Sequence, residues 1–596
     1  SVQATENSKV LIAKLKSKDP ADTLIVTSIQ KMSIVAKECE ERDREIIQNK
    51  RIVFIIDEAH RSTFGDMLTD IKDAFLRAIF FGFTGTPIYD ENEKKMNTTA
   101  SVFGNELHRY TIADGLNDKN VLGFDPCMIM VYTDRDMRRV VALEKAKATT
   151  EQEAIADPQK SKIYYKYMND VPMAGYLDGA GDYHSGIEDN FPNAQYKNDV
   201  YTKEVVKDVA NNWDRLTHNS MFHAIFATSS IAEAINYYRL FKGTAPHLKV
   251  AALFDPNIDN NDGFDIKADA LNEIILDYNA QYNQHFSIPT YALMKKDISA
   301  RLAHKYPYTR IEREPDKQIN LLIVVDQMLT GFDSKWISTL FLDKVLQYEN
   351  IIQAFSRTNR IFGDAKPFGS IRYYRRPHTM RRNIDDAVKL YSGDRPYALF
   401  VQKLPDNIRA LNHVFAEITM LFKYAGKPDF MSLPDDKPAR RKFAKLFNKL
   451  TELLEAARVQ SFTWEDPTSK DEATGEIVTL DFDEHTYYIL QQRYKELGRG
   501  GRGETDDGEA YDLKSHITEM DTGRIDADYM NSRFDKYMKV INLKGASAKD
   551  IEDAETELHR TFATLSQEEQ KYANLFLHDI QSGDVNVEPG KTFRDY

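Results

Sequence analysis

Short apolar runs that end in polar residues recur along the first part of the chain, and this feature most restricts its fold. The runs lie in ADTLIVTSIQKM (residues 21–32), RIVFIIDEAH (51–60) and RAIFFGFTGTP (77–87), with charged, helix-like stretches between them. Nearly continuous apolar strands that alternate with helices are typical of a parallel sheet covered on both faces. We therefore expect residues 1–125 to form part of an α/β lobe, with its polar residues at the carboxyl ends of the strands.

A second series of the same kind follows. Strands are predicted in FHAIFAT (222–228), LKVAALFD (248–255), INLLIVVD (319–326) and STLFLDKVL (338–346), and a helix in ENIIQAFSRTNRIF (349–362). Between the two series the pattern loosens, and GYLDGAGDYHSGIEDN (175–190) is rich in Gly and Asp, as in loops. We expect a second parallel-sheet lobe over residues 126–395, with an irregular insertion near 135–215.

The last third of the chain lacks strand patterns. Residues 408–425 and 439–459 carry apolar residues at helical spacing. A chain of 596 residues is also too long for one hydrophobic core. Residues 396–596 are therefore expected to be a mostly α-helical domain, in which 437–449 is an amphipathic helix with a basic outer face.

Composition excludes some classes of protein. The net charge of −13 argues mildly against nucleic acid as a partner, although local patches decide such binding. The two cysteines, Cys39 and Cys127, allow one disulfide but no disulfide framework or cysteine-rich zinc site. No apolar run is long enough to cross a membrane and the N-terminus has no secretory signal, so we expect no membrane partner and a cytoplasmic location. The chain begins at Ser1 without Met, and we interpret it as a fragment or a processed piece.

The stretch VFIIDEAH ends an apolar strand with adjacent carboxylates. An aspartate there, Asp57, can hold Mg²⁺ through its water shell, and Glu58 can polarise an attacking water. His60 can couple the site to a neighbouring segment. The alternative is a strand end with ordinary solvated acids.

FTGTP follows another buried strand about one helix later. The hydroxyls of Thr84 and Thr86, on either side of Gly85, can link a triphosphate site to a partner lobe. The alternative is a simple Gly-Pro turn.

Two stretches of the second lobe carry related chemistry. In LTGFD, Thr330 and Gly331 can contact a phosphate, and Asp333 can bind a ribose or orient an arginine. In QAFSRTNR, Arg357 and Arg360 share a helical face with Gln353, one turn earlier. Such arginines can neutralise charge on a transferred phosphoryl group, whereas a solvated basic helix end is the alternative.

Taken together, DEAH, TGTP, TGFD and QxxxRxxR, in this order and each near a strand end, resemble the motifs of superfamily-two helicases and translocases. More narrowly, IDEAHRS, FGFTGTPI, LTGFD and QAFSRTNRIF resemble the motor (R) subunit of type I restriction enzymes, with SRTNR replacing the common GRxGR. The resemblance covers roughly residues 20–395 by motifs, and it implies an α/β fold of two RecA-like parallel-sheet lobes followed by a helical domain.

The resemblance also implies roles for single residues. Asp57 and Glu58 serve Mg²⁺ and the hydrolytic water, with His60, Gly331, Asp333 and Gln353 at the ATP site. The TGTP residues couple hydrolysis to motion, and Arg357 and Arg360 sense the γ-phosphate. Contacts to DNA are expected from Thr27 and Gln30 in TSIQK and from Thr330.

A basic cluster adds candidate DNA contacts. In IRYYRRPHTMRRN (371–383), Arg375 and Arg376 stand beside tyrosines, a combination suited to phosphate contacts with some stacking. The alternative is a loop whose arginines pair with nearby acids.

The expected function is ATP-dependent translocation of double-stranded DNA as part of a type I restriction R subunit, pumping DNA toward a nuclease domain. The implied cofactors are ATP and Mg²⁺, and the implied partners are duplex DNA and the methyltransferase (M) and specificity (S) subunits. The phosphate-binding motif G-x-x-x-x-G-K-[S/T] has no match in the chain, and we expect it N-terminal to Ser1. The alternatives are another repair or remodelling translocase, or a non-catalytic scaffold.

Overall fold

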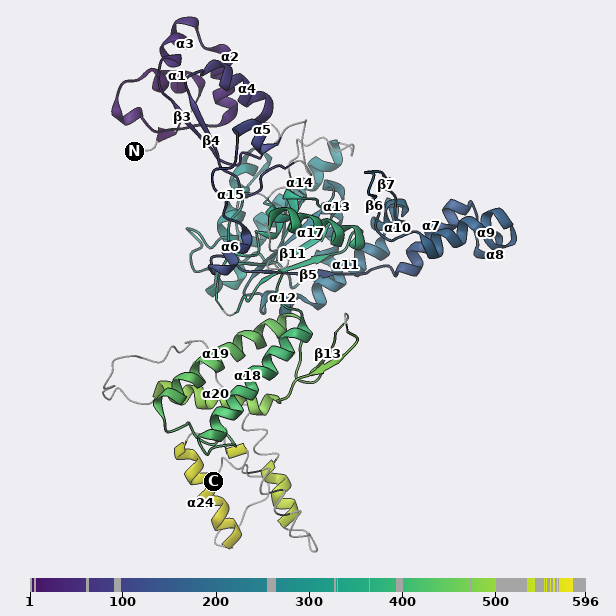
Figure 1. The fold of residues 1–596 in the computed structure, drawn as a ribbon, viewed down its shortest axis with the longest axis vertical. Helices are drawn as coiled ribbons and strands as arrows, with labels where there is room; N and C mark the ends of the chain where they lie inside the picture. The colour runs from purple at the N-terminus through teal and green to yellow at the C-terminus, as the bar shows by residue number, and fades with distance from the viewer. Residues whose placement is uncertain are drawn as a thin grey trace. The chain divides into compact units, whose positions relative to one another are not determined.

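The computed structural model divides the chain into two compact units: residues 1–362 with 368–401, and residues 363–367 with 402–596 (Figure 1). The described residues are 3–4, 7–60, 64–89, 98–254, 264–325, 328–329, 331–363, 365–392, 400–471, 474–499, 533–541, 551, 554, 558, 561–562, 565 and 567–582. Within these ranges no helix is long and apolar enough to cross a membrane.

The first lobe contains short parallel strand pairs with helices packed on them. Its strands are β1 (Gln3–Ala4), β2 (Ile25–Val26), β3 (Val53–Ile56) and β4 (Ile79–Gly82). β1 pairs with β2 and β3 with β4, both in parallel. Its helices are α1 (Ser8–Lys16), α2 (Ile29–Glu38), α3 (Glu41–Gln48), α4 (Phe64–Ala74) and α5 (Thr99–Phe103).

Among the described residues of this lobe, one face of β3 and β4 packs on the core. Phe54 and Phe80 stack at 4.8 Å between ring centroids and face a cluster built by α1, α2, α3 and α4. The alternate side chains point the other way, and Val53 is 56% exposed and Ile55 71% exposed. The expectation of a sheet covered on both faces is thus wrong for these strands among the described residues, because alternation sends every second apolar side chain to the uncovered face.

The second lobe is a six-stranded parallel sheet in the order β5-β12-β11-β8-β10-β9. The strands are β5 (Phe124–Met128), β8 (His223–Thr228), β9 (Val250–Leu253), β10 (Leu321–Val324), β11 (Ile337–Asp343) and β12 (Gly369–Tyr373). Every residue of β8, β10, β11 and β12 is buried. Continuous burial is the result expected for inner strands of a parallel sheet with covered faces.

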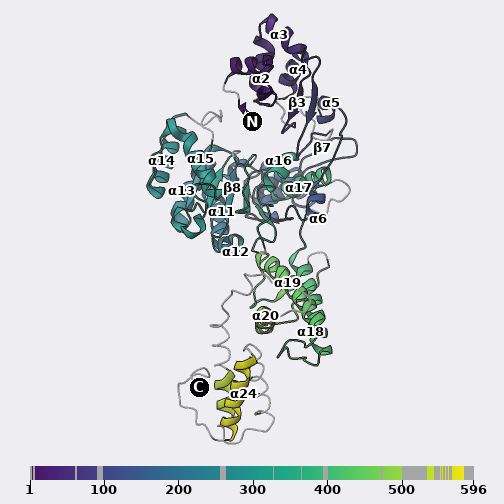
Figure 2. The ribbon, with the colours of Figure 1, turned by 90° about the vertical axis from the view of Figure 1, so that its left-hand side faces the viewer.

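Helices enclose this sheet, as Figures 1 and 2 show. α13 packs on β8, β9 and β10, α12 on β11, and α17 on β5. The helices around the sheet are α6 (Ile112–Asn117), α11 (Asp199–Asn211), α12 (Trp213–Thr217), α13 (Ile231–Thr244), α14 (Phe264–Tyr282), α15 (Tyr291–Leu302), α16 (Glu349–Phe355) and α17 (Pro377–Tyr391).

The segment 135–215, expected to be irregular, is mostly helical. It holds all but the first residue of α7 (Asp134–Ala146), together with α8 (Glu151–Ala156), α9 (Pro158–Tyr165), α10 (Ile187–Asn190) and the whole of α11. Thr133, Thr150, Asp157 and Asn198 each cap a helix by accepting a backbone N–H. The Gly- and Asp-rich stretch that suggested a loop contains a short hairpin of β6 (Tyr176–Leu177) and β7 (Tyr183–His184).

The second unit is mostly helical, as predicted. Its described residues include α18 (Leu404–Tyr424), α19 (Lys437–Val459), α20 (Glu484–Arg499) and α24 (Gln567–Ser582), and a hairpin of β13 (Thr468–Lys470) with β14 (Ile477–Thr479). α19 packs between α18 and α20 around a core that includes Phe443, Phe447 and Leu454, each 0% exposed. Parallel α/β structure followed by a helical region confirms the predicted fold class.

Candidate functional site

One glutamine of the second lobe contacts two motifs of the first. Gln353 lies on α16, and its Nε2 donates to Thr86 Oγ1 at 2.8 Å and lies 2.9 Å from His60 Nε2. An amide NH₂ has two hydrogens, so it can serve both acceptors at once. The three stretches DEAH, TGTP and QAFSRTNR therefore meet at a single side chain.

These contacts fix the tautomer of His60. Gln353 Nε2 can only donate, so His60 Nε2 accepts, and a neutral imidazole then carries its proton on Nδ1. This Nδ1 lies 2.7 Å from Thr84 Oγ1 and 3.3 Å from Glu58 Oε2. The hydroxyl of Thr84 also accepts the backbone N–H of Thr86 at 3.1 Å. His60 thus links the carboxylate of DEAH to the Thr84 hydroxyl directly and to the Thr86 hydroxyl through Gln353.

The two acids of DEAH stand at the end of β3. Asp57 is exposed and accepts the backbone N–H of Glu58 at 2.9 Å, while the Glu58 side chain is 47% exposed. Glu58 has φ of 53°, a left-handed conformation that is strained for a residue other than glycine. Strain of this kind concentrates at functional sites, where neighbouring structure must hold it in place.

The two arginines of QAFSRTNR differ in their surroundings. Arg357 donates from Nε to the carbonyl of Gln353 at 3.0 Å and from Nη1 to the carbonyl of Phe332. Burial, and then the charge of Arg360, lower the pKa of Arg357 against the opposing effects of Asp333 and Glu58. The influence of Glu58 means that a guanidinium of the second lobe lies in the field of the DEAH carboxylate.

Arg360 is 44% exposed and pairs from Nε with Asp333 Oδ1 at 2.6 Å. Asp333 belongs to LTGFD, in which Gly331 adopts φ of 72°. Glycine is the residue best suited to that conformation. Thr330 lies outside the described residues, so its predicted role stays a prediction.

Two of the remaining candidates in the first lobe, Thr27 and Gln30, lie apart from this group in the chain. Thr27 follows β2 and is partly buried, and Gln30 is exposed in the first turn of α2. Ser28 caps α2 by accepting the N–H of Lys31 at 3.4 Å. Gly85, between the two threonines of TGTP, is exposed, and a side chain there would meet no atom within 4 Å.

Arg375 forms ion pairs with acids of its own lobe. Its side chain is 11% exposed, and its Nη2 lies 3.0 Å from both Glu233 Oε2 and Asp343 Oδ2. Asp343 is fully buried and also accepts the hydroxyls of Tyr201 and Tyr237, at 2.7 and 2.8 Å. Burial raises the pKa of Asp343 to about 6, although Arg375 opposes the shift. This corresponds to the alternative for the basic cluster, so we do not carry Arg375 forward as a DNA contact.

Among the described residues, the Arg376 side chain makes fewer hydrogen bonds than that of Arg375. It has φ of 45°, and its Nη2 donates to Asn193 Oδ1 at 3.1 Å near the surface. Sequence reasoning missed Asp343 and Glu233 as partners of the cluster. The one visible sign was the acid that ends the apolar strand STLFLD.

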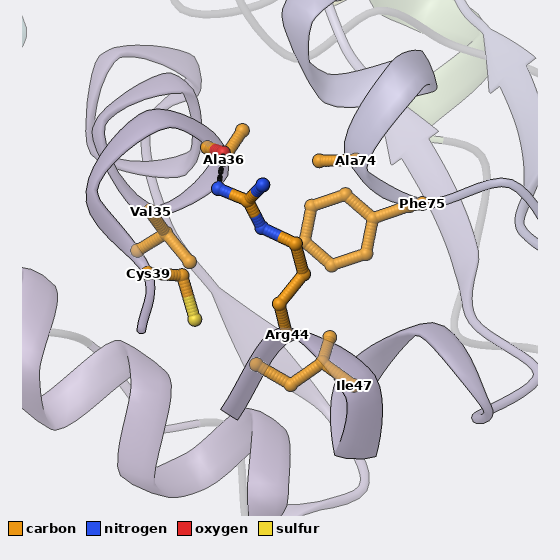
Figure 3. Close-up of a pocket in the computed structure, with 7 residues that line it drawn as sticks. All are labelled: Val35, Ala36, Cys39, Arg44, Ile47, Ala74 and Phe75. Atoms are coloured by element: carbon orange, nitrogen blue, oxygen red, sulfur yellow. Dashed lines mark hydrogen bonds between the residues drawn. The ribbon is translucent and has the colours of Figure 1, made fainter. Parts of the chain in front are cut away.

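A separate pocket in the first lobe takes no part in this arrangement. Figure 3 shows it among α2, α3 and α4, with the Arg44 side chain crossing it and donating to the Ala36 carbonyl at 3.2 Å. Burial raises the pKa of the Cys39 thiol on its wall. The thiol is therefore a poor nucleophile.

The site residues fit a magnesium nucleotide better than a metal ion alone. Among the described residues no group of three or more His, Cys, Asp or Glu could hold a metal ion. Mg²⁺ commonly keeps several waters and is held by one or two carboxylates together with substrate phosphates. Asp57, exposed at a strand end, can supply such a carboxylate.

Three family models match successive parts of the chain. Residues 1–162 match the SWI2/SNF2 ATPase, residues 220–376 match type I restriction enzyme subunit R domain 3, and residues 399–596 match the C terminal part of type I restriction and modification enzyme subunit R. The first covers DEAH and TGTP, and the second covers LTGFD and QAFSRTNR. The motif order read from the sequence is thus spread over a match to an ATPase domain and a following match to type I restriction enzyme subunit R.

Curated relatives agree with these matches. The type I restriction enzyme SsaAORF53P endonuclease subunit of Staphylococcus saprophyticus is 30% identical over 465 residues, which make up 76% of this chain and 44% of that protein. The SauMRSORF196P endonuclease subunit of Staphylococcus aureus is 35% identical over 66% of this chain and 37% of that protein. The chain thus spans less than half the length of these relatives.

Among solved structures, the ATP-dependent Type ISP restriction-modification enzyme LlaBIII bound to DNA aligns with 98% of this chain and 37% of that one, at 10% identity and a TM-score of 0.34. A likeness at that level carries no argument about function. Family membership rests instead on the sequence matches, which follow the order of the R-subunit domains and include the residues of the site. The chain belongs to the family of type I restriction enzyme R subunits.

Proposed function

We propose that the chain is the ATP-driven, double-stranded DNA translocase part of a type I restriction enzyme R subunit, working with Mg²⁺ and with M and S subunits. The observation that carries the proposal is the pair of contacts from Gln353 to His60 and Thr86. A contact of this kind makes the position of one lobe depend on the state of the motif in the other. Such dependence is what a motor needs and a passive scaffold does not.

The side chains divide the work of hydrolysis. Bound Mg²⁺–ATP supplies the γ-phosphoryl group and a divalent charge that offsets the phosphates. Glu58 orients a water for attack, and Asp57 accepts hydrogen bonds from the water shell of the metal. Arg360 is exposed and paired only through its Nε with Asp333 in the contacts described above, so its remaining N–H groups can meet negative charge from the second lobe.

Motion follows from the hydrogen bonds that join the motifs. His60 contacts Glu58 on one side and Gln353 on the other, so a change at the carboxylate can alter whether His60 Nε2 accepts the hydrogen bond of the glutamine. Thr27, Gln30, Thr330 and Arg376 are the DNA contacts that we propose. Alternate grip by the two lobes would then move the duplex.

The test needs an R subunit that contains a phosphate-binding loop as well as these residues. Gln353→Leu keeps the size of the side chain and removes both hydrogen bonds, together about 2 kcal/mol, or roughly 30-fold. DNA-stimulated ATP hydrolysis and displacement of a triplex-forming oligonucleotide should both fall by that order, with duplex affinity nearly unchanged.

Gln347→Leu is the matched control, because Gln347 is exposed just before α16. Translocation at the wild-type rate in Gln353→Leu would refute the coupling role. The 596-residue chain alone, in which G-x-x-x-x-G-K-[S/T] has no match, should hydrolyse ATP negligibly. Robust DNA-stimulated turnover by this chain would contradict our account of the phosphate site.

A further inference from the structure

The most regular charged surface among the described residues lies on α19, in the second unit. Lys437, Arg441, Lys445 and Lys449 are all exposed and follow one another at intervals of four, so they form a line along the helix that we call the α19 stripe. At a rise of 1.5 Å per residue the stripe extends about 18 Å. Residues 437–449 contain six basic residues and no acid.

The opposite face of α19 holds the helix firmly in place. Phe443, Phe447, Leu450 and Leu454 are each 0% exposed and belong to the core shared with α18 and α20. Figure 1 shows these three helices together in the second unit. The stripe is therefore displayed on a fixed helix rather than on a loop, with its cations held in line.

Nothing within the helix favours this arrangement. Like charges four residues apart destabilise a helix. Lys437, in the first turn, also opposes the helix dipole, which prefers cations at the carboxyl end. Lys449, at the far end of the stripe, pairs with Glu452 at 3.7 Å. An external polyanion would remove both penalties.

The shape of the stripe indicates which polyanion would bind to it. The row of cations is elongated and winds about 120° around the helix, so it fits a row of phosphates better than a compact anion, and duplex DNA presents one negative charge per about 1.7 Å of its axis. The aromatic residues of this part of α19, Phe443 and Phe447, are buried, so no ring is available for the base stacking typical of single-strand binding.

We infer that the α19 stripe binds the phosphate backbone of duplex DNA without reading its sequence. The inference rests on the proposed function, since it adds a contact to the DNA that the motor would move. It places that contact in the helical unit, outside the motif-bearing lobes.

The test measures duplex affinity of the full chain against salt concentration. Lys437→Gln with Lys445→Gln removes two contacts, so the slope of log K against log salt should become shallower by about 1.8. The matched control is Lys423→Gln with Lys470→Gln, which removes two exposed lysines of the same unit away from α19. The control should keep the wild-type slope, and Lys437→Arg with Lys445→Arg should restore it.

The melting temperature shows whether the variant still folds, and other outcomes of the binding test distinguish the alternative explanations. The glutamine variant should melt at or slightly above the wild-type temperature, because it relieves like-charge repulsion. An unchanged slope, an equal loss in the control, or a loss confined to single-stranded DNA would overturn the assignment while leaving the proposed motor intact. A wild-type chain with no salt-dependent duplex binding would instead count against the DNA-binding part of the proposed function as well.

Discussion

The strands of the first lobe and the sheet of the second are built from similar apolar runs, yet they bury them differently. All six residues of β8 are buried, whereas β3 alternates between exposed and partly buried positions. Ile55 is 71% exposed in β3, and Phe226 is 0% exposed in β8. An apolar run therefore predicts a strand, while the elements packed against each face decide how much of that strand is buried.

This difference in burial does not change where the polar residues at the ends of the strands lie. Asp57 and Glu58 follow β3 and the TGTP stretch follows β4, as the sequence predicts, even though one face of those strands is bare among the described residues. We expect the second lobe to act as the rigid partner, which presents its side chains to a less firmly packed first lobe. The predictions below test that contrast.

The largest effect should come from Arg360. In an R subunit with a phosphate-binding loop, Arg360→Ala should lower DNA-stimulated ATP hydrolysis by about 10³–10⁵, the range seen when an arginine that stabilises phosphoryl transfer is removed. Duplex affinity should stay nearly normal. Arg313→Ala, a change at an exposed arginine of the same lobe, is the control. Near-normal turnover with a lowered melting temperature would reduce Arg360 to a stabilising role through its pair with Asp333.

A smaller effect should separate the cores of the two lobes. Phe226→Ala should destabilise the second lobe by about 3–5 kcal/mol, because it opens a cavity in a fully buried strand. Ile55→Ala should change the stability of the first lobe by less than about 0.5 kcal/mol. Hydrogen exchange resolved by peptide can follow each lobe separately. A large loss of protection around β3 in Ile55→Ala would show that its outer face is covered in solution.

The smallest expected effect is a loss of folding stability as the pH falls. His223 is fully buried, its Nδ1 lies 2.6 Å from the Ile319 carbonyl, and burial lowers its pKa to about 3. A depressed folded-state pKa means that the unfolded chain binds the proton more readily. Stability from this group is therefore complete above the ordinary pKa of 6.5 and is lost as pH falls from there toward 3. The loss should approach about 1.4 kcal/mol per pH unit.

Fluorescence can assign this loss to the second lobe. Trp213 and Trp336 lie in that lobe and Trp464 in the other unit, so a Trp464→Phe background reports on the second lobe alone. His223→Gln in that background should flatten the acid dependence of the urea midpoint. The raised pKa of Asp343, about 6, acts in the opposite direction between pH 4 and 6, so Asp343 must be left unchanged. An identical acid profile in the variant would remove His223 as the cause.

The site was more predictable from sequence than its surroundings. Asp57, His60, Thr86 and Gln353 could be placed because each sits at a fixed offset from an apolar strand or on a short helix. Arg375 could not, since its partners Glu233 and Asp343 lie 142 and 32 residues away and only folding brings them to it. The helices of 135–215 were missed because the Gly and Asp residues of 175–190 outweighed the capping residues on either side.

The glutamine of α16 has a consequence for how easily the lobes separate. Its two hydrogen bonds contribute a net of about 1 kcal/mol each, so the contact by itself favours the joined lobes by only about 2 kcal/mol. A ligand that prefers the separated form by a few kcal/mol more would then decide which form dominates. The glutamine therefore biases the junction between the lobes without locking it.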